Sequence, residues 1–235
     1  MKGAAATQAR GALAACYDAP MRIDIVLDLV CPWCFIGKRR LELALERRPE
    51  LSPAIHWRPF QLNPEMPDGG MTRQDYLVAK FGGSQHAGRI YHTVAEAGAA
   101  LGIEFAFERI RRAPATRNAH RLVRRAAAFG RAGALVDAVF RAYFTEGKDV
   151  SEPRVLLAAA ASVGLDADDT RRFLASDEGL AQVLEDERAS RRIGINAVPC
   201  FIFEGQYAIS GAQEPEFFLP VFDLVQTAAG TAALA

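Results

Sequence analysis

The apolar positions of the first sixty residues predict a β-α-β unit. Residues 22–30 (RIDIVLDLV) are rich in Ile, Val and Leu and alternate in part with charge, which predicts a buried strand. Residues 35–48 (FIGKRRLELALERR) repeat apolar side chains at helical spacing, and Pro49 marks the end of that helix. A second strand is expected over residues 54–61, before the breaker-rich LNPEMPDGG.

The middle of the chain predicts helices. From Thr72 to about Arg192, apolar residues recur at helical spacing, with glycines and prolines as stops, and we expect no second sheet there. Two short β-rich runs then follow within residues 200–211, on either side of Glu204-Gly205, which is a hairpin signal. The last segment, PEFFLPVFDLVQTA, has a helical pattern with an expected kink at Pro220.

This order of elements predicts an α/β protein with a thioredoxin fold. A helical subdomain is inserted between the β-α-β half and the β-β-α half. We expect an unstructured extension over residues 1–20, a first half over residues 21–62, a helical insertion over residues 63–192 and a second half over residues 193–227.

Composition and charge limit the kinds of partner and the cellular compartment that we expect. The 28 Lys and Arg residues balance the 28 Asp and Glu residues, so we expect neither nucleic acid nor a membrane as partner. Only four cysteines occur, too few for a disulfide-stapled secreted scaffold, which favours a cytoplasmic protein. The N-terminal LAAC resembles a lipoprotein cleavage site at Cys16, but Gln8 and Arg10 interrupt the apolar region that a signal segment needs. We therefore expect a tail without structure, or a protein whose true first residue is Met21.

The candidate chemistry is a CxxC motif, CPWC, where the first strand meets the helix. Cys31 stands at the start of the helix, where unpaired backbone N–H groups and the helix dipole stabilise a thiolate, and we expect it to be partly exposed. Cys34 follows one helical turn later, close enough to attack a mixed disulfide formed by Cys31. Pro32 fixes the first turn, whereas Trp33 covers apolar surface and carries no charge that could stabilise the thiolate.

A second part of the site is expected at Val198-Pro199, directly before a predicted strand. In a thioredoxin fold a cis-proline loop lies opposite the CxxC, and the backbone of its preceding residue can pair with a substrate strand. We therefore expect a cis bond between Val198 and Pro199 and a substrate-binding role for both. Cys200 comes next, and its place at the start of an apolar strand predicts a buried thiol outside the catalytic cycle.

Other readings of these residues are weaker. A zinc site needs four ligands, and no such spacing is present among Cys16, Cys200, His56, His86, His92 and His120, so we expect no metal and no other cofactor. The CxxC could also be two buried cysteines that take no part in any reaction, which is the other alternative to a redox site. We assign no catalytic role to His92 or His120, and residues 109–125, rich in arginine, are expected to form a solvated face.

Several stretches together resemble the DsbA family of thiol–disulfide oxidoreductases, in particular its FrnE-like branch. They are DLVCPWCFIGKRRLE, WRPFQLNPEMPDGG, YLVAKFGG, EGKDVSEPRVLLAAA and GINAVPCFIFEGQYAISGAQ. The resemblance implies Cys31 as the attacking thiol, Cys34 as the resolving thiol and Val198-Pro199 as the loop that faces the substrate. Two positions depart from the branch pattern: Ala115 replaces an asparagine, and Cys200 replaces a larger apolar residue.

The resemblance implies disulfide exchange with protein or small-molecule thiols, glutathione among them. One alternative is a glutathione-dependent isomerase or transferase of the 2-hydroxychromene-2-carboxylate isomerase and kappa type, a branch that typically has serine at the position of Cys31. A second alternative is a non-enzymatic redox-sensing or chaperone-like module that binds through the apolar surface around Trp33 and Phe35. The sequence does not fix the oligomeric state.

Overall fold

The structure, a computed structural model, describes residues 20–232. The predicted extension over residues 1–20 and the lipoprotein-like Cys16 therefore lie outside the described residues, apart from Pro20. Met21 leads directly into the first strand, as its carbonyl accepts a hydrogen bond from the Ala54 N–H at 2.8 Å.

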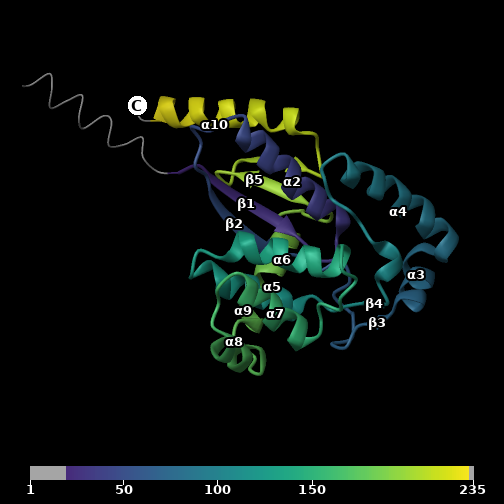
Figure 1. The fold of residues 1–235 in the computed structure, drawn as a ribbon. Helices are drawn as coiled ribbons and strands as arrows, with labels where there is room; N and C mark the ends of the chain where they lie inside the picture. Colours follow the sequence, from purple (N-terminus) through teal and green to yellow (C-terminus); the bar gives the residue numbers. More distant parts are fainter. Residues whose placement is uncertain (1–19, 233–235) are drawn as a thin grey trace, which may run out of the picture.

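Within the described residues, four strands form one mixed sheet in the order β2-β1-β5-β6. The strands are β1 (Arg22–Leu27), β2 (Ala54–Pro59), β5 (Cys200–Phe203) and β6 (Tyr207–Ser210). β1 runs parallel to β2 and antiparallel to β5, which pairs antiparallel with β6. Two distant parts of the chain thus share one sheet (Figure 1), and the predicted α/β thioredoxin fold is confirmed.

The junction that carries the CxxC differs in its bounds from the prediction. β1 ends at Leu27 rather than at residue 30, because the chain turns after Asp28 and the Cys31 N–H donates to the Asp28 carbonyl at 3.1 Å. Helix α2 (Pro32–Glu46) begins at Pro32, so Cys31 stands at its start as expected, three residues before the apolar pattern of residues 35–48. Proline suits this position because the first N–H groups of a helix have no intrahelical partner.

The segment between the two halves of the sheet is mainly helical, as predicted. Its helices are α3 (Arg73–Phe81), α4 (Ser84–Ala99), η2 (Phe107–Arg109), α5 (Arg117–Ala127), α6 (Ala132–Phe144), α7 (Pro153–Ser162), α8 (Ala167–Leu174) and α9 (Leu180–Arg192). The expectation of no second sheet is wrong, because β3 (Met71–Thr72) pairs antiparallel with β4 (Arg112–Ala113). Strands of two residues are too short to leave an alternating pattern in the sequence.

The C-terminal helix also differs from the prediction. A 3-10 turn, η3 (Pro215–Phe217), precedes helix α10 (Leu219–Ala232), so Pro220 falls in the first turn of α10 and not in its interior. A proline there removes no helical hydrogen bond, and the predicted kink is wrong for this reason. Figure 1 shows α10 and α2 on one side of the sheet and α5 to α9 on the other.

The hairpin between β5 and β6 is confirmed. Glu204 and Gly205 both have positive φ, 51° and 68°, in the three-residue turn, 204–206, between the strands. Turns with two positive φ angles match the twist of the strands that they join, which is why Gly is favoured there. Next to this hairpin, Phe203 of β5 contacts Phe218 and Phe222 of the C-terminal segment, so that segment packs against the sheet.

The insertion is fixed to the rest of the fold by a polar contact and by aromatic packing. Lys38 of α2 is buried and forms an ion pair with Asp137 of α6, with 2.6 Å between Nζ and Oδ1. Phe35 of α2 stacks on Phe140 of α6, with ring centroids 5.0 Å apart. Both contacts come from α2, so the helix that begins at the CxxC also holds α6 of the insertion in place.

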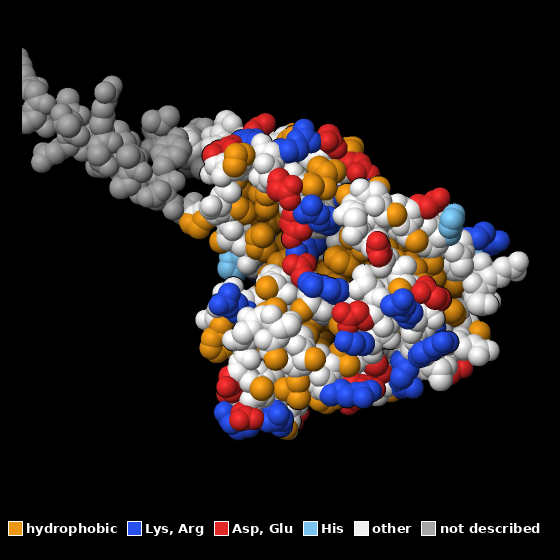
Figure 2. Space-filling view, viewed as in Figure 1, with side chains coloured by type: hydrophobic (Ala, Val, Ile, Leu, Met, Phe, Trp, Pro, Cys, Tyr) orange, Lys and Arg blue, Asp and Glu red, His pale blue; other side chains and the backbone are white. Residues whose placement is uncertain are grey.

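The surface carries mixed charge. Figure 2 shows acidic and basic side chains interspersed over the face in view, in keeping with the equal numbers of acidic and basic residues in the chain. Within residues 20–232, no helix has the length and apolar character that spanning a bilayer requires.

Gly37 allows α2 to approach the Val198-Pro199 loop closely. A Cβ atom at Gly37 would lie 2.8 Å from Pro199 Cγ and 3.2 Å from Phe201 Cζ. Both distances are shorter than ordinary van der Waals contact, and the proline ring cannot rotate away. The glycine therefore sets the distance between the helix and the loop.

We predict that Gly37→Ala destabilises the fold, although alanine usually favours a helix. Overpacking costs about 1–3 kcal/mol, which exceeds the gain of about 0.5–1 kcal/mol from replacing a helical glycine. Urea unfolding followed by circular dichroism measures the change in the free energy of unfolding. Gly88→Ala is the matched control, because Gly88 lies inside α4 with no atom within 4 Å of its Cβ position, and it should stabilise the protein. Equal stabilisation by both substitutions would contradict the close approach.

Candidate active site

Cys31 occupies the N-cap of α2, at the carboxyl end of the central strand. Its carbonyl accepts the Cys34 N–H at 3.0 Å, which closes the first helical turn. The expected partial exposure is wrong, because only 4% of Cys31 is exposed. Its thiol instead lines an internal cavity, so a partner reaches it through that cavity.

Cys34 lies deeper and is held as a thiol. It is 1% exposed. Burial, followed by a hydrogen bond with Cys31 and the charge of Cys31, holds the pKa of Cys34 well above its usual range. A buried thiol that stays protonated suits the resolving cysteine, which reacts only after the mixed disulfide has formed.

The Val198-Pro199 loop lies against Cys31. The Val198–Pro199 bond is cis, as predicted. The Cys31 Sγ lies 3.7 Å from the Val198 carbonyl oxygen, although the two residues are 167 positions apart in the sequence. The pairing of Val26 in β1 with Cys200 in β5 brings the loop there, since Val26 leads to the CxxC and Cys200 follows the loop.

Asp28 and His120 form a buried polar contact beneath the CxxC that sequence reasoning missed. Asp28 is 1% exposed, and its Oδ1 lies 3.3 Å from His120 Nε2. Its Oδ2 accepts the Leu62 N–H at 2.8 Å. His120 comes from α5 of the insertion, and the pattern of an isolated helical histidine carries no sign of this partner. In the sequence, the feature that could have indicated this contact is Asp28, an acidic residue near the end of a predicted buried strand.

The loop after β2 is held by a second buried carboxylate. Glu187 of α9 accepts hydrogen bonds from the Gln61 backbone N–H at 3.3 Å and from Gln61 Nε2 at 2.6 Å. Arg191 pairs with Glu187 at 2.9 Å and also donates to the Gln61 carbonyl at 2.8 Å. Helix α9 of the insertion therefore holds Gln61, while Asp28 holds the next residue, Leu62, in the segment that borders the CxxC.

A cavity of about 320 Å³ opens onto Cys31 between the sheet and the insertion. Pro32, Trp33 and Val198 border it on the side of the CxxC and the loop. The rest of its lining comes from the segment after β2, from α3 and α4, from the η2 and β4 region and from α6. Four of the six predicted site residues, Cys31, Pro32, Trp33 and Val198, therefore line this cavity, whereas Cys34 and Pro199 do not.

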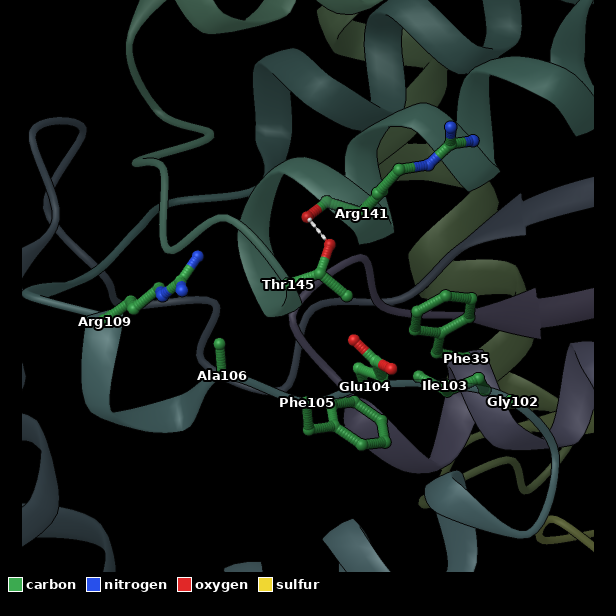
Figure 3. A pocket seen from close by; sticks show the side chains of 9 residues that line it. All are labelled: Phe35, Gly102, Ile103, Glu104, Phe105, Ala106, Arg109, Arg141 and Thr145. Carbon is green, nitrogen blue, oxygen red and sulfur yellow. Dashed lines mark hydrogen bonds between the residues drawn. The ribbon is translucent and has the colours of Figure 1, made fainter.

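A second hollow, of about 510 Å³, lies on the other side of Phe35 and Phe105. Figure 3 shows Glu104 at its centre and the Arg141 side chain directed away from it. The hydrogen bond drawn there joins the Thr145 hydroxyl to the Arg141 carbonyl within one helical turn, at 2.6 Å. No cysteine lines this hollow, and its polar groups do not converge.

Cys200 is buried as predicted, 6% exposed and packed with Val26 and Phe60. Burial raises the pKa of Cys200. In the described part of the chain all three cysteines, Cys31, Cys34 and Cys200, are free thiols. Those residues also contain no group of three or more His, Cys, Asp or Glu side chains placed to hold a metal ion.

The expectation of a solvated face over residues 109–125 is wrong for Arg121. This residue is 3% exposed, and its guanidinium donates to the carbonyl oxygens of Glu178 at 2.8 Å and Phe173 at 3.1 Å. Burial lowers the pKa of Arg121, although Asp177 and Glu178 act in the opposite direction. Carbonyls at the end of α8 lack helical partners, which explains why an arginine is buried against them.

A thioredoxin fold, a CxxC at a helix start and a cis-proline loop against it define the class of disulfide oxidoreductases. The model of the DSBA-like thioredoxin domain family matches residues 22–222. The chain therefore belongs to this family, and it is an oxidoreductase of the DsbA-like type.

Solved structures resemble the chain over most of its length. A probable DsbA oxidoreductase from Streptomyces coelicolor is 32% identical, with 90% of each chain covered and a TM-score of 0.76. A 2-hydroxychromene-2-carboxylate isomerase is 19% identical, with 92% of this chain and 100% of that chain covered and a TM-score of 0.64. The cytosolic disulfide reductase DsbM from Pseudomonas aeruginosa with GSH is 20% identical, with 91% of this chain and 100% of that chain covered and a TM-score of 0.56. The last two share the fold.

We predict that Cys31 is alkylated first when the reduced protein meets iodoacetamide near neutral pH. The raised pKa of Cys34 keeps its thiol protonated there, and a protonated thiol is a poor nucleophile. Reactivity at Cys34 should rise only as the pH passes above the ordinary cysteine range of about 8.5. Peptide mass spectrometry of timed samples measures each site, and Cys200 is an internal control for a buried thiol. Faster labelling of Cys34 than of Cys31 would reverse the two roles.

Proposed function

We propose that the protein exchanges disulfides through Cys31 and Cys34 by way of a mixed disulfide with its substrate. The observation that carries the proposal is the placement of the Cys31 sulfur 3.7 Å from the Val198 carbonyl and at the wall of a cavity. Cys31 occupies the N-cap of α2, at the positive end of the helix dipole.

In the first step, the Cys31 thiolate attacks one sulfur of the substrate disulfide. A new S–S bond joins Cys31 to that sulfur, and the other substrate sulfur leaves as a thiolate. The substrate is reduced by two electrons when the second step is complete.

In the second step, Cys34 attacks the Cys31 sulfur of the mixed disulfide. The Cys31–Cys34 bond forms, and the remaining substrate sulfur leaves. Cys34 must lose its proton for this attack, and the departing thiolate is the group that takes it up. Loss of the negative charge on Cys31 assists, because that charge contributes to the raised pKa of Cys34.

The Val198-Pro199 loop is the proposed contact for the substrate backbone. The Val198 carbonyl already faces Cys31, so a substrate held there would place its disulfide in reach of the thiol. Pro32 and Trp33 support the site by fixing the first turn of α2 and by covering its apolar side.

Three finer assignments are part of the proposal: the branch of the family, the location and the kind of partner. The motifs of the chain support a place in the FrnE-like branch, and the cysteine at position 31 argues against a glutathione-dependent isomerase, which typically has serine there. A cytoplasmic location is supported by the scarcity of cysteines and by the cytosolic relative DsbM. The same relative, with GSH, supports small thiols as partners in addition to proteins.

We predict that Cys34→Ser traps substrate on Cys31. Without a resolving thiol, exposure to hydroxyethyl disulfide should leave one mercaptoethanol adduct on Cys31, visible by intact-mass and peptide mass spectrometry. The wild-type protein should instead form its own disulfide, and Cys31→Ser should form neither product.

Cys200→Ala is the matched control, as it removes a buried thiol from the same region. Turnover of this variant should stay within about twofold of the wild type, which is less than ~0.5 kcal/mol in barrier height. An adduct on Cys34 in the Cys31→Ser protein, with turnover retained, would contradict the proposed roles.

A further inference from the structure

The cavity beside Cys31 is lined by aromatic side chains and by two basic ones, Arg73 and Lys80. We propose that it binds small-molecule disulfides that carry an acidic group on an aromatic body, with Arg73 as the residue that recognises the acidic group. This inference rests on the proposed disulfide exchange and adds the class of substrate. Three features carry it: unpaired positive charge, aromatic walls and a limited volume.

Arg73 and Lys80 give the cavity positive charge without an acidic counterpart. Both line it, and none of its lining residues is Asp or Glu. Among the ion pairs of residues 20–232, neither side chain has a carboxylate partner. The Lys80 ammonium, which is exposed, has only Asn63 Oδ1 at 3.4 Å. An anionic group on a ligand would supply the missing partner.

Two tyrosines hold the Arg73 guanidinium in place. It lies 4.7 Å from the ring centroid of Tyr91 and 5.7 Å from that of Tyr76. Burial raises the pKa of Tyr76 to about 12 and also raises the pKa of Tyr91, so both phenols are neutral at physiological pH. Neither tyrosine therefore neutralises Arg73. The guanidinium is fixed in direction and remains available to an anion.

Aromatic side chains form much of the lining that Arg73 and Cys31 share. Trp33, Tyr143 and Phe144 line the cavity together with Phe107 and the two tyrosines. Rings favour the faces and edges of other rings, by about 0.5–1.5 kcal/mol for each pair beyond area burial. The flat body of an aromatic thiol fits such walls better than a peptide backbone, whose N–H and C=O groups would lose hydrogen bonds there.

The size of the cavity limits its occupant. Its volume of about 320 Å³ is at the lower end of the range for small-molecule sites, about 300–1,000 Å³. Helices α3 and α4 of the insertion supply several of its walls, through residues 73–94. A folded protein cannot enter such a space, whereas a small disulfide can place one sulfur at Cys31 and its acidic group at Arg73.

The test uses four disulfides in single turnovers with pre-reduced protein. They are dithiobis(nitrobenzoate), aromatic and anionic; dithiodipyridine, aromatic and neutral; dithiodipropionate, aliphatic and anionic; and hydroxyethyl disulfide, aliphatic and neutral. Stopped-flow absorbance and the loss of free thiol give second-order rate constants. Each constant is divided by that of dithiothreitol with the same disulfide, which removes intrinsic reactivity. The exchange oxidises the Cys31–Cys34 pair and releases two thiols, so no further reductant is needed.

The wild-type protein should give its highest normalised rate with dithiobis(nitrobenzoate). Arg73→Gln should lower that rate by about 10-fold or more, the usual effect of losing a charged hydrogen bond, and leave dithiodipyridine within about twofold. Arg73→Lys keeps the charge and should retain part of the preference, which separates loss of charge from loss of packing. Arg89→Gln is the matched control, because Arg89 is exposed on α4 and does not line the cavity.

The outcomes separate this inference from the proposed function. Equal normalised rates for all four disulfides, or an equal loss for all four in Arg73→Gln, would overturn the inference while leaving disulfide exchange intact. Failure of the wild-type protein to react with any of them would overturn the proposed function itself. A preference that is retained in Arg73→Gln would show that another group recognises the anion, and would overturn the role of Arg73.

Discussion

The antiparallel pairing of β1 with β5 is the constraint on which the site depends. Val26 lies opposite Cys200, so the end of one strand and the start of the other reach the same edge of the sheet. The CxxC follows the first strand and the cis-proline loop precedes the second, which brings Cys31 Sγ within 3.7 Å of the Val198 carbonyl. A register shift of one residue would reverse every side chain of β5 and remove this contact. The backbone ladder thus fixes a functional distance between segments far apart in the chain.

The insertion does more than cover the sheet. His120 reaches Asp28 beneath the CxxC, and Glu187 holds Gln61 in the loop after β2. Buried polar groups of this kind must be satisfied, because an unpaired one costs about 1–3 kcal/mol. The same insertion supplies Arg73 and, apart from Trp33, the aromatic walls of the cavity. One segment therefore both stabilises the reactive turn and restricts what can reach it.

The sequence predicts those features that are local. Strand patterns, the CxxC at the start of α2 and the hairpin at Glu204-Gly205 each depend on a few neighbouring residues, and each is confirmed. The contact of Asp28 with His120 could not be read in this way, because the two residues belong to different elements and neither pattern specifies its partner. The burial of Cys31 and of Arg121 is likewise set by tertiary packing, which overrides what residue type alone suggests.

The central claim is that Cys31 and Cys34 form a reversible two-electron pair from which Cys200 is excluded. The most direct measurement equilibrates the full chain in buffers of graded reduced and oxidised glutathione, quenches it with acid and maps every cysteine peptide by mass spectrometry. We predict a single internal disulfide, Cys31–Cys34, that follows a two-electron Nernst curve while Cys200 remains a thiol. A disulfide that includes Cys200, or a pair that stays reduced until Cys31 is glutathionylated without closure, would contradict it.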